Sequence, residues 1–194
     1  QQKAEQFSLK KMAENTDPFQ TPFTVSVDAK TAKTGVSVSD RLKTIETILD
    51  PKASSKGLVS PGHMFPLVAK DGGVLHRAGH TEGAVDLLKI AGLKQVGVIM
   101  EIMKDDGSMA RLPDLLKFKK KHGLKIISLK SLIDFRLGKE SLVERVASPK
   151  LPTEFGEFIA VGFKDKVYGE EYIALVKGHV SGKKNVLVRV HSGC

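Results

Sequence analysis

The chain has 194 residues, of which 41% are apolar and 6% aromatic, and its formal net charge is +9. This length fits one domain, or one domain with part of a second. No apolar run approaches the ~18 residues of a membrane span, and no signal peptide is recognisable. The lone cysteine, Cys194, excludes an internal disulfide framework. We therefore expect a cytoplasmic protein. The start at Gln1 predicts a fragment, so an upstream plastid transit peptide stays open.

The positive charge favours either nucleic acid or small anions such as phosphorylated substrates. The lysines are scattered and are not interleaved with aromatic residues. The densest basic run, residues 117–122, precedes Gly123 and is typical of the last turn of a helix. We expect neither a nucleic-acid partner nor a membrane.

Strand and helix patterns alternate in the first part of the chain, as in α/β domains. Residues 23–27 alternate between apolar and polar, which predicts a half-buried strand. A helix is expected next, with Ser39 as its N-cap and Pro51 after its end. Residues 64–69 are expected to form another strand.

The same alternation continues toward residue 138. Thr81 is expected to cap a helix that Gly92 ends. Residues 96–103 are nearly all apolar, which predicts a central strand covered on both faces. Pro113 predicts the start of a further helix. A strand over residues 125–129 and a short helix over residues 131–137 are expected to complete the domain.

The pattern changes beyond residue 138. Residues 139–150 are polar and predict a linker. Three strand-like runs with turn-like segments between them predict an antiparallel meander that opens a second domain over residues 151–194. These runs cover residues 155–163, 172–179 and 185–190. Because a sheet of only three strands would leave its edges exposed, further strands are expected downstream.

Two histidines lie in segments that can carry chemistry. His63 follows a Pro-Gly pair at a strand end, and His80 directly precedes a predicted helix. Free N–H groups at a helix start attract phosphate, and Arg77 can hold phosphate with two hydrogen bonds. Gly79 lets a ligand approach the backbone. The alternative for both histidines is a structural role, as a helix cap or in a local hydrogen bond.

Glu101 interrupts the apolar run of residues 96–103. A carboxylate inside a buried strand is unfavourable unless it is paired or bound to a metal. Such a group is suited to proton transfer, although a structural role is equally compatible with the pattern. Residues 105–107, Asp-Asp-Gly, predict a turn after this strand. Imidazole, guanidinium, hydroxyl and carboxylate groups together are what a metal-assisted reaction on a sugar phosphate requires.

The motifs resemble the 3,4-dihydroxy-2-butanone 4-phosphate synthase family over about residues 21–137. The segments concerned are FTVSVD at 23–28, TGVS at 34–37, PGH at 61–63, GGVL at 72–75, RAGHTE at 77–82 and DGSMAR at 106–111. The resemblance implies an α+β sandwich-like synthase domain with a mixed sheet and helices. It also implies a homodimer that converts D-ribulose 5-phosphate into 3,4-dihydroxy-2-butanone 4-phosphate and formate with Mg2+ or Mn2+.

The resemblance further implies roles for individual residues. His63 and Glu101 would be catalytic, and His80 would be a metal ligand. The substrate would bind to Arg77, Ala78, Gly79, His80, Thr81 and Glu101. Ala78 stands where many members have glycine, a change between small residues that is expected to be tolerated. The family's acidic metal-binding loop is expected upstream, so the isolated fragment is expected to be inactive.

The second part resembles the opening of GTP cyclohydrolase II. The segments concerned are LPTEFG at 151–156, ALVKG at 174–178 and RVHSGC at 189–194. The resemblance implies GTP binding by Arg189, Val190, His191, Ser192 and Gly193, and a Zn2+ site, incomplete here, in which Cys194 is the first ligand. Gly193 stands where glutamate is usual, which leaves the activity of this half open. Both parts together imply a bifunctional riboflavin-biosynthesis protein.

Two other readings remain at this point. A relative without catalytic activity would keep the fold and support a partner enzyme, and the upstream acidic loop would be damaged in it. A basic nucleic-acid-binding module would bind generic DNA or RNA with an affinity that falls steeply with salt.

Overall fold

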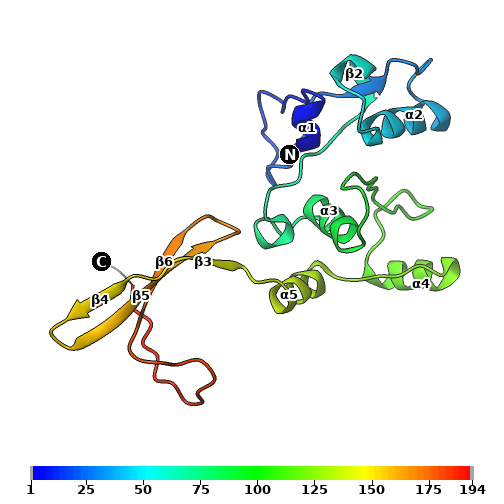
Figure 1. Ribbon diagram of the computed structural model, residues 1–194. Helices are drawn as coiled ribbons and strands as arrows, with labels where there is room; N and C mark the ends of the chain where they lie inside the picture. The colour runs from blue at the N-terminus through cyan, green and yellow to red at the C-terminus, as the bar shows by residue number, and fades with distance from the viewer. Residues whose placement is uncertain (1, 193–194) are drawn as a thin grey trace. The chain divides into compact units, whose positions relative to one another are not determined.

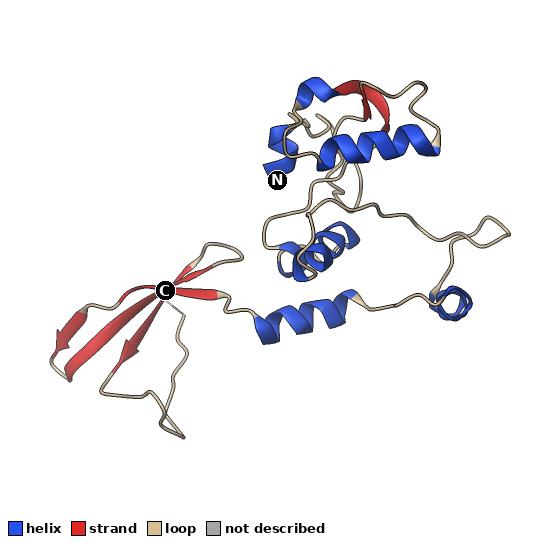
Figure 2. Cartoon of the chain, turned by 45° about the vertical axis from the view of Figure 1, so that its right-hand side comes forward, coloured by secondary structure: helices blue, strands red, loops and turns tan. Residues whose placement is uncertain are grey.

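The computed structural model describes residues 2–192 and divides into two compact units, Gln1–Gly138 and Lys139–Cys194 (Figure 1). Most of the helices lie in the first unit and most of the strands in the second (Figure 2). This arrangement confirms the expected α/β class followed by antiparallel strands. Within residues 2–192, no helix is long and apolar enough to cross a membrane.

The first unit opens with α1 (Gln2–Gln6) and contains one short antiparallel pair, β1 (Val27–Ala29) with β2 (Leu58–Met64). All three residues of β1 are buried. The expected strands over residues 23–27 and 64–69 are therefore displaced to β1 and β2. Apart from Val27 and Met64, which belong to β1 and β2, the predicted segments form only isolated bridges, such as the one between Phe23 and Leu67.

The next helix, α2 (Val38–Leu49), packs against β1. Its N-cap is Ser37, whose hydroxyl accepts the N–H of Asp40, so the predicted cap at Ser39 is wrong by two residues. The Thr44 hydroxyl donates to the Asp40 carbonyl and accepts the N–H of Ala29. These two bonds fix the helix on the strand.

The Asp40 carboxylate makes the stability of this unit sensitive to acid. A hydrogen bond from Lys43 and bonds from nearby backbone N–H groups outweigh burial and hold the pKa of Asp40 well below its usual value. The folded state therefore binds this proton less readily than the unfolded chain. The resulting stabilisation is complete above the ordinary aspartate pKa of about 3.9 and is lost as the pH falls toward the folded value.

We expect Asp40→Asn to lower the melting temperature at pH 7, and this difference to shrink as the pH falls below about 4. Thermal unfolding of the parent and variant at stepped pH measures both effects. A difference that is the same at every pH would contradict this role of the carboxylate.

The segment before α3 (His80–Ile90) contains a 3-10 turn, η2 (Gly73–Leu75). Gly79 is the N-cap of α3 and Thr81 lies inside the helix, so the predicted cap at Thr81 is wrong by two residues. The helix begins earlier because glycine at the N-cap adopts the extended backbone that precedes a helix, with φ −114° and ψ 157°.

A buried ion pair joins α3 to α5 (Leu129–Lys139). Arg136 donates to Asp86 at 2.8 Å and to the carbonyl of Gly72 at 2.7 Å. Asp86 also accepts the N–H of Val74 at 2.8 Å. One carboxylate thus ties both helices to the turn that leads into α3.

Residues 96–103 do not form the predicted central strand. Only Met103 bridges to Met109, across the turn that was expected at residues 105–107. Met100 is 81% exposed, and Glu101 is exposed as well. A central strand needs neighbours, but the two strands described in this unit pair only with each other. Residues 125–128 likewise form no strand.

The remaining helices of the first unit match their predictions closely. In α4 (Leu112–His122), Pro113 lies in the first turn, and Gly123 ends the helix with a left-handed φ of 64°. The α5 helix is longer at both ends than the predicted residues 131–137.

Gly138 lies in the last turn of α5, and a Cβ added there would meet nothing within 4 Å. We expect Gly138→Ala to stabilise the fold by up to about 1 kcal/mol, because alanine loses less backbone entropy in a helix. Chemical denaturation measures the change. A lower free energy of unfolding would show that this turn is not helical in solution.

In the second unit, β5 (Gly156–Asp165) pairs antiparallel with three strands, β3 (Val143–Ala147), β4 (Lys150–Thr153) and β6 (Glu171–Val176). The meander prediction is confirmed for β5 and β6. Part of the expected linker is strand instead, because the exposed residues of β3 bond to the far end of β5.

Residues 185–190 form no strand, contrary to expectation. Their apolar side chains are open to solvent, with Leu187 99% and Val190 93% exposed. The pattern predicts a strand, but no described strand pairs with it.

Candidate functional site

His63 lies near the end of β2 and contacts a carboxylate of β1. Its Nδ1 is 2.7 Å from Oδ2 of Asp28, and its backbone N–H donates to Oδ1 at 3.0 Å. The Asp28 side chain is 9% exposed, whereas the imidazole is 50% exposed. The pair therefore has a buried carboxylate and a ring that a ligand can reach.

Asp28 remains ionised in this position. Burial by itself would raise the pKa of Asp28, but the two hydrogen bonds from His63 and the attraction of His63 and Arg41 outweigh burial and lower it. The carboxylate therefore acts as an acceptor at neutral pH.

Two glycines allow the strands and the adjacent turn to approach this pair. A Cβ on Gly62 would lie 2.1 Å from the backbone carbon of Val27, and a Cβ on Gly35 would lie 2.0 Å from Oδ2 of Asp28. Gly35 also has a φ of 76°, which side-chain-bearing residues rarely adopt. The PGH and TGVS motifs thus contain the glycines that permit the Asp28–His63 contact.

Arg77 is held in place from two sides. Its Nη1 donates to Oε2 of Glu82 at 2.8 Å, and its Nη2 donates to the carbonyl of Phe19 at 3.2 Å. Glu82 is fully buried, and its Oε1 accepts the N–H of Lys70 at 3.0 Å. A Cβ on Gly79 would lie 2.4 Å from Nη1 of Arg77. Guanidinium carries five N–H bonds, so donors remain for a ligand.

The residues after Arg77 form the start of α3. Ala78 and His80 are exposed, whereas Thr81 is 8% exposed. The first N–H groups of a helix have no intrahelical partner. Gly79, the N-cap of α3, has no side chain that could accept hydrogen bonds from them. Guanidinium, imidazole and free N–H groups therefore lie within one short segment.

Glu101 and His63 are not brought into contact with this helix start. Within residues 2–192, no hydrogen bond or ion pair links either side chain to residues 77–81. The predicted burial of Glu101 is wrong, because the segment around it lacks the neighbouring strands that would cover it.

Metal-binding residues do not cluster in the described part of the chain. No group of three His, Cys, Asp or Glu side chains there could hold an ion. His80 offers one imidazole, and Mg2+ prefers several oxygen ligands, so the described residues do not fit a complete divalent-metal site.

Two residues of this region, Asp28 and Glu82, were not predicted as functional. Asp28 occupies a polar position of an alternating strand, and Glu82 occupies the first turn of a helix, where carboxylates are common. The glycines nearby were the available signal, because close approach of another group is one reason for glycine.

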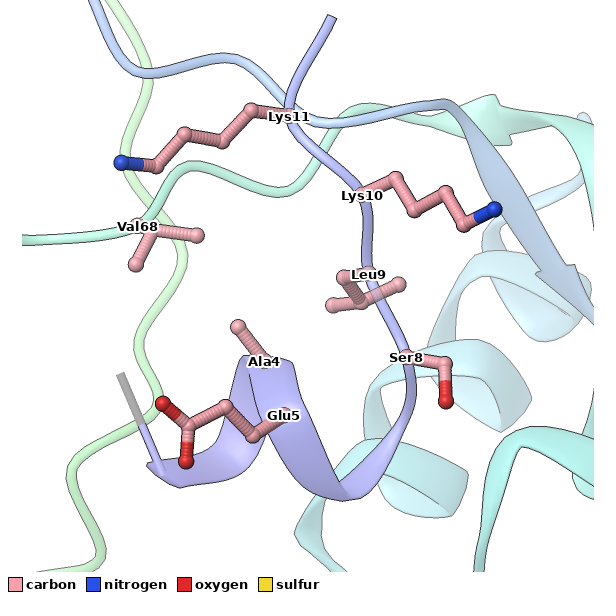
Figure 3. Close-up of a pocket in the computed structure, with 7 residues that line it drawn as sticks. All are labelled: Ala4, Glu5, Ser8, Leu9, Lys10, Lys11 and Val68. Atoms are coloured by element: carbon pink, nitrogen blue, oxygen red, sulfur yellow. The ribbon is translucent and has the colours of Figure 1, made fainter.

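A shallow pocket lies elsewhere, beside α1 (Figure 3). Its volume is ≈ 420 Å³, and it is lined by Ala4, Glu5, Ser8, Leu9, Lys10, Lys11 and Val68. None of the predicted site residues lies in it, so this pocket is not the candidate site.

The predicted GTP-binding segment is exposed where it is described. Arg189, Val190, His191 and Ser192 belong to no helix or strand. Gly193 and Cys194 lie outside the described residues.

Two family models match the chain. The model of 3,4-dihydroxy-2-butanone 4-phosphate synthase matches residues 1–135, and the model of GTP cyclohydrolase II matches residues 144–194. Riboflavin biosynthesis protein RibBA of Aquifex aeolicus is 52% identical over 197 residues, which cover 100% of this chain and 48% of the relative. The RibBA of Bacillus subtilis is 49% identical over 193 residues, which cover 98% of this chain and 48% of the relative. The chain thus spans about half the length of these relatives.

Solved structures agree with the sequence comparison. RibBX, a two-domain 3,4-dihydroxy-2-butanone 4-phosphate synthase from A. baumannii, superposes with a TM-score of 0.79 at 39% identity. The match covers 92% of this chain and 53% of that one. A second structure is a 3,4-dihydroxy-2-butanone 4-phosphate synthase in complex with two magnesium ions. Its TM-score is 0.64 at 30% identity, over 71% of this chain and 70% of that one.

Proposed function

Because the chain belongs to the 3,4-dihydroxy-2-butanone 4-phosphate synthase family, we propose that it acts on D-ribulose 5-phosphate in riboflavin biosynthesis. The products would be 3,4-dihydroxy-2-butanone 4-phosphate and formate. Together the two products contain all the carbon, hydrogen, oxygen and phosphorus atoms of the substrate, so the reaction needs no co-substrate and no redox partner. The observation that carries this proposal is the start of α3, where Arg77 is fixed beside exposed His80 and free N–H groups.

The phosphate would bind at this helix start. Free N–H groups and the positive end of the helix dipole favour a phosphate there. Arg77 would add a guanidinium whose direction Glu82 and the Phe19 carbonyl already fix. Gly79 and Ala78 keep the approach open, and Thr81 would contribute through its backbone, because its side chain is mostly buried.

His63 and Glu101 would move protons. Enolisation, dehydration, rearrangement and loss of formate each require a proton to leave or join the sugar. The imidazole of His63 and the carboxylate of Glu101 are both accessible to a ligand and can carry out such transfers. Bringing Glu101 to the substrate would require ordering of residues 96–103 beside it.

A divalent cation, Mg2+ or Mn2+, would assist, as the relative with two magnesium ions indicates. His80 would be one ligand, and the other ligands would come from residues other than those described. When bound, the cation would polarise the ketone and hydroxyl groups of the sugar.

For the second unit, we propose that it takes part in a GTP cyclohydrolase II activity of the full protein. Arg189 to Ser192, with Gly193, would contribute to GTP binding, and Cys194 would be one of the thiolates on a Zn2+ ion. We also propose a homodimer of the full protein in the cytoplasm. These assignments rest on the family resemblance.

Formate release from D-ribulose 5-phosphate with Mg2+ tests the synthase function. We expect the full protein to release formate, and Arg77→Met to raise KM for the sugar phosphate strongly. Absence of formate from folded, metal-supplied protein would favour a relative that keeps the fold without catalysis. Salt-dependent binding to generic DNA would instead favour the nucleic-acid alternative.

A further inference from the structure

The contact between Asp28 and His63 defines which nitrogen of the imidazole carries the hydrogen. Asp28 accepts both N–H groups that His63 directs toward β1, the backbone N–H at 3.0 Å and the ring Nδ1 at 2.7 Å. The ring is half exposed, while the carboxylate is buried. Within residues 2–192, the imidazole forms no other side-chain hydrogen bond or ion pair.

From this geometry we infer that Asp28 is a positioning residue, which fixes His63 as the Nδ1–H tautomer and leaves Nε2 as its proton acceptor. This inference rests on the proposed function for the role of His63, but the tautomer itself does not depend on it. An ionised carboxylate has acceptors only, so an Nδ1 that is 2.7 Å away must carry the hydrogen. In a neutral imidazole the other nitrogen then has a free lone pair.

The surroundings pack closely around the ring and the carboxylate. The backbones of Gly62 and Gly35 lie so close to β1 and to the pair that a Cβ at either glycine would overlap with them. Arg41 attracts the Asp28 carboxylate and favours its charged form. The pair is thus built by four segments of the first unit, β1, β2, α2 and the turn before α2.

The consequence for the reaction is a defined proton path. Nε2 takes a proton from the substrate, and the bonding electron pair stays on the sugar. The imidazolium keeps its Nδ1–H on Asp28, whose negative charge stabilises the new positive charge. Nε2 later returns the proton to a later species on the path, so the histidine is unchanged over the cycle.

The substitution Asp28→Asn would exchange the donor and acceptor nitrogens of the His63 ring. The backbone N–H of His63 is always a donor, so the amide oxygen must face it. The amide NH2 then faces Nδ1, which has to become the acceptor. Asp28→Asn therefore converts His63 to the Nε2–H tautomer and removes the proton acceptor from the side that the substrate can reach, without a change in side-chain size.

The experiment uses 15N NMR of the full protein with labelled histidine, alongside formate release. In the unsubstituted protein, neutral His63 is expected to be predominantly Nδ1–H, and in Asp28→Asn predominantly Nε2–H. The kcat for formate release is expected to fall by about 100-fold or more in Asp28→Asn. In a His63→Gln background the same substitution is expected to cause no further fall, whereas a merely structural role would lower kcat in both backgrounds.

The outcomes separate the two proposals. Predominance of the Nε2–H tautomer in the unsubstituted protein would overturn the inference about Asp28 without any variant. An unchanged kcat for formate release in the Asp28→Asn protein would also overturn the inference about Asp28. If the unsubstituted protein shows the Nδ1–H tautomer but releases no formate, the proposed function fails and the tautomer assignment stands.

Discussion

Asp86→Ala is expected to lower the free energy of unfolding by about 3–5 kcal/mol, the largest stability effect that the structure predicts. The Asp86 and Arg136 side chains are 6% and 7% exposed, and the substitution would remove the carboxylate from this buried ion pair. It would also remove the acceptor for the N–H of Val74 in the turn that leads into α3. Urea denaturation at neutral pH measures the change.

An exposed ion pair on α5, the helix that carries Arg136, provides the matched control. Lys130 and Asp134 are 2.6 Å apart, but their side chains are 82% and 57% exposed. Asp134→Ala is expected to change the free energy of unfolding by no more than about 0.5 kcal/mol. Similar losses in the two variants would show that burial does not distinguish these pairs, and the account of how α5 is held would be wrong.

Glu82→Gln is expected to weaken both the fold and the binding of a phosphorylated substrate. Glutamine keeps the shape of the side chain, but its one oxygen cannot accept from both Lys70 N–H and Arg77. Loss of one hydrogen bond to a buried carboxylate is worth about 1.5–3 kcal/mol. Because Arg77 loses its fixed direction, KM for the sugar phosphate is expected to rise more than kcat falls.

Two measurements check this expectation, urea denaturation for stability and initial rates over a range of substrate concentrations for the split between KM and kcat. Glu46→Gln in α2 is a suitable control, because within residues 2–192 the Glu46 side chain forms no hydrogen bond or ion pair with the residues proposed to bind substrate. A Glu82→Gln protein with reduced stability but an unchanged KM would remove Glu82 from substrate binding and leave it a structural role only.

Local signals in the sequence predicted the positions of α2 to α5 to within about two residues at each cap. Pro113 and Gly123 bracket α4 because proline suits the first turn and glycine the left-handed residue after the last. The caps of α2 and α3 were each placed two residues late, since Ser37 and Ser39 are equally good caps by type and a glycine cap such as Gly79 carries no side-chain signal.

Long-range features were predicted less well. The apolar run of residues 96–103 has the composition of a buried strand, but composition does not provide the neighbouring strands, and Glu101 is exposed as a result. Asp28 lies 35 positions from His63, and Glu82 lies 12 positions from Lys70, and the hydrophobic periodicity of the sequence does not predict such pairs. Motif resemblance predicted roles for His63 and Arg77, whereas the carboxylates that contact them were found only in the structure.

The proposed function gives this chain the proton-transfer and phosphate-binding residues of a synthase acting on D-ribulose 5-phosphate. The most direct test measures formate release by the full protein with Mg2+, beside Glu101→Gln, a substitution of an exposed side chain that should leave the fold intact. We expect the unsubstituted protein to release formate, and the rate of release to fall by about 100-fold or more in the variant. Equal formate release by both proteins would contradict the role of Glu101, and no release by either would contradict the synthase function itself.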